Sequence, residues 1–223
     1  MKKLSFYLSG IALFAIASII LTVASCKKSE SVVTPRLPGN EFLTTVVFQC
    51  INKAAPYDTT TAIWRQVDPS GAAAPDTSKA LLVYKKNSVY SCNIYILDES
   101  KTAATSYASN TPYNFNINHL ASTTVNVTPE IRARQNYHLE CFNLTGGVPS
   151  LLTNLSIVRT DYDNNTPALQ VGLNDNVTTN NNTIPANTNG RMEIIQEHQP
   201  NVKNGTCGPG SIDFDIFLGV SIQ

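Results

Sequence analysis

Charged residues are scarce in this chain, and they are balanced in sign. They make up 14% of the 223 residues, with 16 Lys and Arg against 16 Asp and Glu. A protein that binds nucleic acid through its phosphates needs a basic patch, and no basic run is present. We therefore expect no nucleic-acid partner.

Motifs with a defined reaction are also missing. The sequence has no Gly-x-Ser-x-Gly turn, which presents the nucleophile in many hydrolases. Its three histidines are His119, His138 and His198, and their spacing does not match that of familiar transition-metal sites. We interpret them as satisfied core or surface histidines and expect no enzymatic activity. A hydrolase stays open as an alternative, because catalytic groups need only meet in space.

One apolar segment stands out, from Leu4 to Ala24, after Lys2 and Lys3. A basic start followed by an apolar segment is the layout of a secretory signal. About 20 apolar residues could also span a bilayer, but small and polar residues interrupt this segment. It closes with the sequence LTVASC at 21–26, which resembles the lipobox of bacterial lipoproteins.

That resemblance implies cleavage after Ser25 and attachment of diacylglycerol to the thiol of Cys26. Residues 1–25 are then a cleaved signal peptide, and the polar residues 26–40, with prolines and a glycine, are a flexible tether. Residues 41–223 suffice for a single domain with its own core. We expect a protein that is held at the outer membrane by its lipid, on a face that the sequence does not specify.

The composition predicts an all-β domain. Asn and Thr each occur 23 times, and Asn favours turns whereas Thr favours strands. Regular short strands with turn residues between them indicate a single antiparallel β-sandwich, immunoglobulin-like or related. The predicted strands are Leu43–Ile51, Thr60–Val67, Ala80–Tyr84, Val89–Leu97, Tyr113–Leu120, Tyr137–Leu144, Leu155–Thr160, Met192–Gln196 and Ile212–Ile222.

Two of the predicted elements carry clear local signals. In the last strand, apolar residues from Ile212 to Ile222 alternate with others, which predicts one apolar inward face. Asp213 and Asp215 then lie on the solvent face. The one predicted helix runs from Thr128 to about Gln135, because a hydroxyl cap and a proline at the first helical position favour a helix start.

Four cysteines remain once Cys26 is lipidated. An exported protein meets an oxidising compartment, so these four can form two disulfides in any of three connectivities. Alternatively, a cysteine in an apolar strand acts as a small buried hydrophobe. The four are Cys50, Cys92, Cys141 and Cys207.

The alternating oxygens of Asp161, Asp163 and Asn165 are a weak candidate for a Ca²⁺ site. The glycine and the later acid of a full calcium loop are absent at the required offsets, and Ca²⁺ takes six or more oxygens. We favour a polar turn in which these side chains bond their own backbone.

The acidic pair Asp98–Glu99 and the aromatic residues complete the candidates for a site. Trp64 and the tyrosines could form a binding platform for sugars or peptides, but aromatic residues in strands usually pack in the core. The tyrosines considered are Tyr57, Tyr84, Tyr90, Tyr95, Tyr107, Tyr113, Tyr137 and Tyr162.

Several segments together resemble an uncharacterised family of outer-membrane lipoproteins from the Bacteroidetes group. The resemblance implies an all-β domain with no established activity, and some members accompany outer-membrane receptors of the TonB-dependent class. This chain departs from the family pattern at Gln66–Gly71 and Glu130–Gln135, so any acid-dependent role of those segments does not carry over. The matching segments are Asn40–Val46, Trp64–Arg65, Leu97–Ser100, Thr160–Asn165, Val171–Leu173, His198–Pro200 and Lys203–Cys207.

The sequence thus favours a lipid-anchored binding module, accessory to an outer-membrane receptor or uptake complex. A calcium-stabilised structural or adhesive lipoprotein is one alternative, and a hydrolase is the other.

Overall fold

The computed structural model describes residues 36–37, 41–66, 74–99 and 117–223. The predicted signal peptide, Cys26 and most of the predicted tether lie outside these residues. The strand β1 (Arg36–Leu37) lies in the predicted tether and pairs with β2 (Glu41–Phe42), which begins the predicted domain. None of the helices in the described part of the chain is long and apolar enough to cross a membrane.

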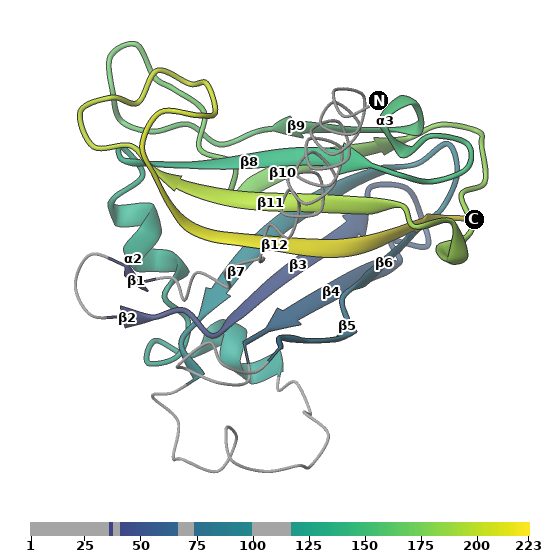
Figure 1. Ribbon diagram of the computed structural model, residues 1–223, viewed down its shortest axis with the longest axis horizontal. Coiled ribbons are helices and arrows are strands. Elements are labelled where there is room, and N and C mark those ends of the chain that lie inside the picture. Colours follow the sequence, from purple (N-terminus) through teal and green to yellow (C-terminus); the bar gives the residue numbers. More distant parts are fainter. Residues whose placement is uncertain (1–35, 38–40, 67–73, 100–116) are drawn as a thin grey trace, which may run out of the picture. The chain divides into compact units, whose positions relative to one another are not determined.

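The larger sheet has six strands, and every neighbouring pair in it is antiparallel. Figure 1 shows two of its strands, β3 (Thr45–Asn52) and β7 (Val89–Leu97), crossing behind the other sheet. In spatial order the strands are β5 (Asp76–Lys79), β4 (Thr59–Arg65), β3 (Thr45–Asn52), β7 (Val89–Leu97), β10 (Asn174–Thr179) and β9 (Leu155–Arg159).

The smaller sheet has four strands, and one of its pairs, β6 with β12, is parallel. The chain passes from one sheet to the other at Ala80. This residue separates β5, at the edge of the larger sheet, from β6, at the edge of the smaller one. The predicted all-β sandwich is confirmed, but it is mixed rather than wholly antiparallel. In spatial order the strands are β6 (Leu81–Tyr84), β12 (Ser211–Ile222), β11 (Arg191–His198) and β8 (His138–Thr145).

Period-two alternation explains why these segments bury one face. In β7, every second side chain from Tyr90 to Ile96 is almost completely buried. The inward residues of β3 and β12, such as Phe48 and Phe214, belong to the same core cluster. Burying apolar area at about 25 cal/mol per Å² is what holds the two sheets face to face.

The helices are short. A helix forms at the predicted place, α2 (Thr128–Ala133), but the predicted hydroxyl cap is wrong: the N-cap is Val127, and the Thr128 hydroxyl accepts the backbone N–H of Ile96 instead. The helix α3 (Leu151–Asn154) adds one turn before β9. The predicted strand Tyr113–Leu120 is wrong for its described part, because residues 117–120 lie in a 3₁₀ helix, Ile117–Ala121. Serine and asparagine side chains just after it bond nearby backbone N–H groups, and such local bonds compete with sheet pairing.

A β-bulge changes the start of β12. Opposite Gln196 and Glu197 of β11 lie Phe214 and Ile212, so Asp213 is the extra residue. A bulge shifts the alternation of the strand by one residue. Consequently Asp213 is 5% exposed and Ile212 is 49% exposed. The predicted inward position of Ile212 and the predicted solvent position of Asp213 are both wrong, because the sequence pattern does not reveal the bulge.

We expect Ile216→Ala to lower the free energy of unfolding by about 2–5 kcal/mol, since it leaves a cavity in the core. Ile212→Ala on the same strand should cost less than about 1 kcal/mol, because its side chain is half exposed. Denaturant unfolding of the two variants measures both values. Equal costs would mean that Ile212 faces the core and that the bulge is absent.

Candidate functional site

The cysteines are paired as Cys50–Cys92 and Cys141–Cys207. The first disulfide links register partners on the neighbouring strands β3 and β7. The second ties β8 to the loop of residues 199–210 that joins β11 to β12. This loop therefore cannot move away from the smaller sheet without breaking a covalent bond.

Asp161, Asp163 and Asn165 lie in a turn in which the carboxylates of both aspartates already accept hydrogen bonds. Asp161 accepts the backbone N–H groups of Gly172 and Leu173. Asp163 accepts the backbone N–H groups of Leu169 and Asn165, together with the side-chain amide of Asn165. These hydrogen bonds to backbone groups are the kind that a polar turn makes.

A metal ion at Asp163 would also be repelled by a positive charge that is already there, the ammonium of Lys203. The ammonium of Lys203 lies 2.8 Å from Asp163 Oδ2, and both side chains are almost fully buried. Burial alone would raise the pKa of Asp163, but hydrogen bonds from the Leu169 backbone and from Lys203 outweigh it and lower that pKa. The ion pair thus fixes Lys203, in the loop 199–210, to the turn before β10.

The acidic pair Asp98–Glu99 is buried at the end of β7. Glu99 accepts hydrogen bonds from Thr45 Oγ1 at 2.7 Å and Arg65 Nε at 3.2 Å. His119 Nδ1 lies 3.0 Å from its other oxygen. His119 is thereby satisfied as the sequence interpretation expected.

The other two histidines, His138 and His198, lie in contact with each other. His138 begins β8, His198 ends β11, and the two are direct partners in the antiparallel register. The bulge brings Asp213 of β12 to the same place. His198 Nδ1 lies 3.1 Å from His138 Nε2, and Asp213 Oδ2 lies 3.4 Å from the latter and 3.9 Å from the former. We call these three residues the His-His-Asp cluster.

The His-His-Asp cluster lies at the polar end of the inward face of the smaller sheet. Moving along β8 and β11, the paired inward residues change from Phe142 and Ile194 to Glu140 and Gln196, and then to the two histidines. His138 is fully buried and His198 is 16% exposed at its side chain. Burial lowers the pKa of His198, and the negative charge of Asp213 opposes this effect.

The cluster is braced from outside. His138 Nδ1 lies 3.0 Å from the carbonyl oxygen of Arg134, just after α2. In the loop 199–210, Gly210 has a φ of +113°, and a Cβ there would overlap the carbonyl oxygen of His198. Glycine is needed because the loop must approach β11 closely in a left-handed conformation.

The aromatic residues that the structure describes do not gather into one exposed platform. Trp64, Tyr84 and Tyr90 are buried in the core, and Tyr95 packs partly buried against a smaller cluster. Among the exposed ones, Tyr137 lies beside the His198 ring, with ring centroids 6.3 Å apart. Tyr57 and Tyr162 are exposed elsewhere, and Tyr107 and Tyr113 lie outside the described residues.

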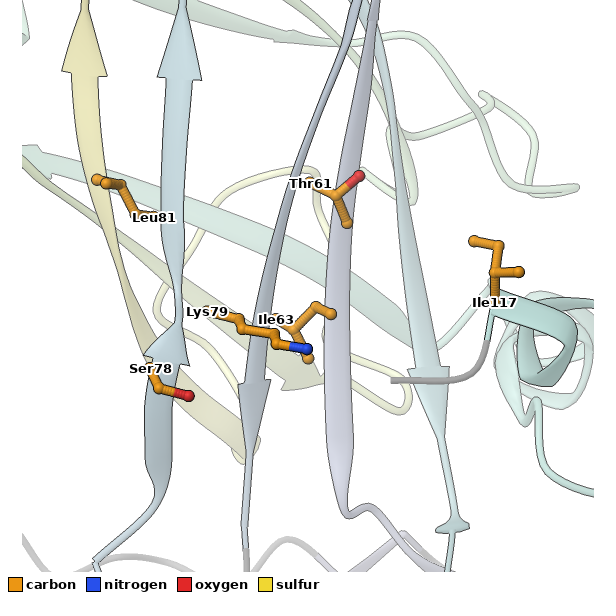
Figure 2. Close-up of a pocket in the computed structure, with 6 residues that line it drawn as sticks. All are labelled: Thr61, Ile63, Ser78, Lys79, Leu81 and Ile117. Carbon is orange, nitrogen blue, oxygen red and sulfur yellow. The ribbon is translucent and has the colours of Figure 1, made fainter. Parts of the chain in front are cut away.

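Two open hollows mark the surface of the described chain. The first has a volume of about 480 Å³. Figure 2 shows residues of β4, β5 and β6 on one side of it and Ile117 on the other. Lys79 is the one ionisable side chain among its described lining residues, so those residues do not include a pair of groups for acid–base chemistry. It is lined by Thr61, Ile63, Ser78, Lys79, Leu81 and Ile117.

The second hollow lies between β8 and β9, which are edge strands of the two sheets. Its volume is about 520 Å³. Phe142, Leu144, Leu152 and Ile157 supply apolar lining, and the remaining lining residues are polar. Those polar residues are Asn143, Thr145 and Glu193.

Comparison of the chain with protein-family models, with curated proteins and with solved structures finds no match.

Two buried acids between the sheets have perturbed pKa values. Burial raises the pKa of Glu140 well above its ordinary value, although a hydrogen bond from Gln196 opposes it. Burial likewise raises the pKa of Asp175 to about 8, the Asp161 carboxylate adds to this, and Arg159 opposes it. Neither acid lines either hollow.

The pKa of Asp175 predicts how stability depends on pH. The folded chain holds this proton up to about pH 8, whereas the unfolded chain releases it near 3.8. Stabilisation by the protonated carboxyl is therefore complete below about pH 4 and is lost as the pH rises to about 8. Asp175→Asn should gain stability over the native chain across this window, by several kcal/mol, since one pKa unit corresponds to about 1.4 kcal/mol.

Denaturant unfolding of both chains at about pH 5 and about pH 9 measures this difference. The control is Asp76→Asn, because a hydrogen bond from Ser78 lowers the pKa of Asp76. Asp76→Asn should instead lose stability, by the same amount at both pH values, because the advantage of the ionised Asp76 disappears only below about pH 4. A stability difference between Asp175→Asn and the native chain that does not change with pH would contradict the prediction.

Proposed function

We propose that the chain is a lipid-anchored, non-enzymatic binding module at the outer membrane, accessory to a receptor or uptake complex. The LTVASC segment, with Cys26 as the lipidated residue, supports the anchor. The two disulfides support export, because they form and persist in oxidising compartments. A partner in or near the membrane then meets the domain more often than a freely diffusing one.

The observation that carries the binding role is the hollow between β8 and β9. It combines apolar side chains with a few polar ones, which is the make-up of protein recognition surfaces. Leu152 projects from α3 at this hollow and is 67% exposed. An apolar side chain this exposed gains most when a partner covers it. We infer that a protein partner contacts the domain here.

The chemistry of the hollows favours binding over hydrolysis. A hydrolase needs a concave site with an acid, base or nucleophile tuned for proton transfer. The acids with raised pKa, Glu140 and Asp175, are buried between the sheets, away from the described lining of both hollows. The geometry of the described residues therefore supports a binding module better than an enzyme.

Cys26→Ser should abolish lipid attachment and release the protein from the membrane fraction, because the hydroxyl does not replace the thiol as the lipid acceptor. Metabolic labelling with palmitate and membrane fractionation measure both effects. Cys207→Ser serves as the control, since it also replaces a cysteine, one that pairs with Cys141 in a disulfide, but should leave labelling unchanged. Membrane retention of an unlabelled Cys26→Ser chain would contradict the anchor, and protease shaving of intact cells reports the exposed face.

A photo-crosslinking residue at position 152 should capture an outer-membrane protein in intact cells, because Leu152 lies at the inferred contact. Leu152→Glu should weaken co-purification of that protein at least about tenfold, the cost of about 1.4 kcal/mol. Val202→Glu is the matched control, since Val202 is 47% exposed and lies outside the hollow. Equal loss in both variants, or no capture from position 152, would contradict the assigned surface.

A further inference from the structure

Three atoms that bind metals converge in the His-His-Asp cluster. They are His138 Nε2, His198 Nδ1 and one oxygen of Asp213, and all lie within 4.8 Å of one another. We propose that His138, His198 and Asp213 form a binding site for a divalent first-row transition-metal ion, of which Zn²⁺ is the test case. The site does not rest on the anchor or on the partner proposed above.

The distances suit such an ion. The three atoms form a triangle with edges of 3.1, 3.4 and 3.9 Å. The point equidistant from its corners lies about 2.0 Å from each of them, which is the length of Zn–N and Zn–O bonds. An ion at or slightly above the plane of the triangle thus reaches all three atoms without a change of backbone.

Hydrogen bonding alone does not satisfy these atoms when both imidazoles are neutral. The contact with the Arg134 carbonyl places a proton on His138 Nδ1 and leaves Nε2 as an acceptor. His198 Nδ1 can donate one hydrogen to that Nε2. Asp213 Oδ2 then receives none, and it is a buried oxygen without a hydrogen-bond partner among the described residues. A cation between the three lone pairs satisfies all of them.

The surroundings have the features of a prepared metal site. The bond from His138 Nδ1 to a backbone carbonyl is the outer contact that orients metal-binding histidines. The ligands come from three neighbouring strands, β8, β11 and β12. The loop 199–210, which separates His198 from Asp213, is held by the Cys141–Cys207 disulfide and by the buried Lys203–Asp163 ion pair. The ligands and the loop are therefore already ordered before an ion binds.

The donor set selects the class of ion. Two imidazole nitrogens and one carboxylate suit zinc and its neighbours, whereas Ca²⁺ and Mg²⁺ prefer oxygen ligands. Three protein ligands leave a fourth tetrahedral position for water. His198 is the most exposed of the three side chains and gives the ion its route from solvent.

The test uses the full chain, without a histidine tag, purified in detergent and stripped with EDTA. Titration calorimetry with Zn²⁺ should show one bound ion per chain. His198→Ala and Asp213→Asn should each weaken binding by more than about 100-fold, the upper end of what outer-contact changes cost. His119→Ala removes a histidine outside the cluster and should bind Zn²⁺ as the native chain does. Ca²⁺ should not compete.

Circular dichroism checks that each variant folds. If Asp213→Asn does not fold, the Zn²⁺ affinity of His198→Ala alone decides the test. X-ray absorption of the zinc-loaded chain should show nitrogen and oxygen ligands at about 2.0–2.1 Å with imidazole outer shells. Failure of the native chain to bind Zn²⁺ would overturn the site, and the His-His-Asp cluster would then be a hydrogen-bonded network without a metal ion. Equal binding by the native chain, His198→Ala and His119→Ala would also overturn it, because the ion would then lie elsewhere.

Discussion

Burial of the inward faces of the two sheets is the interaction on which the rest of the domain depends. Phe48, Tyr84, Tyr90 and Phe214 are among its largest fully buried side chains. A sheet with one apolar face gains this burial only when a second sheet covers it. Because a slip of one residue would turn every inward side chain outward, the core also fixes the register of β8 against β11. That register is what places His138 opposite His198.

Local pattern predicted much of the fold, and its failures have identifiable causes. The alternation of β7 predicted its bounds, since each inward residue is apolar. By contrast, β10 has the sequence NDNVTT and was missed. Its asparagine and aspartate residues have low strand propensity, and pairing with β7 and β9 on both sides makes it a strand. The parallel contact of β6 follows from the crossing at Ala80, which no local pattern contains.

The same distinction separates the candidate sites. The polar turn at Asp161–Asn165 could be predicted because Asp163 bonds backbone groups close along the chain, those of Asn165 and Leu169. His138 and His198 are 60 residues apart, so no spacing rule relates them. Predicting that β8 pairs with β11, and in which register, would have revealed the histidine pair. Asp213 would still have been missed, because only the bulge turns it inward.

The proposed metal site and the proposed export are physically connected. The ligands lie on three strands and meet only in the folded domain, so a bound ion stabilises that domain, by about 2.7 kcal/mol at an ion concentration 100 times Kd. Cys141 is three residues from His138, and Cys207 lies in the loop between His198 and Asp213. The disulfide therefore holds this loop, which joins two ligands, against the strand that carries the third. In a reducing compartment the loop would lose this restraint, and the ion would have to order it at the expense of affinity. An oxidising envelope is thus the setting in which this cluster is best prepared to bind.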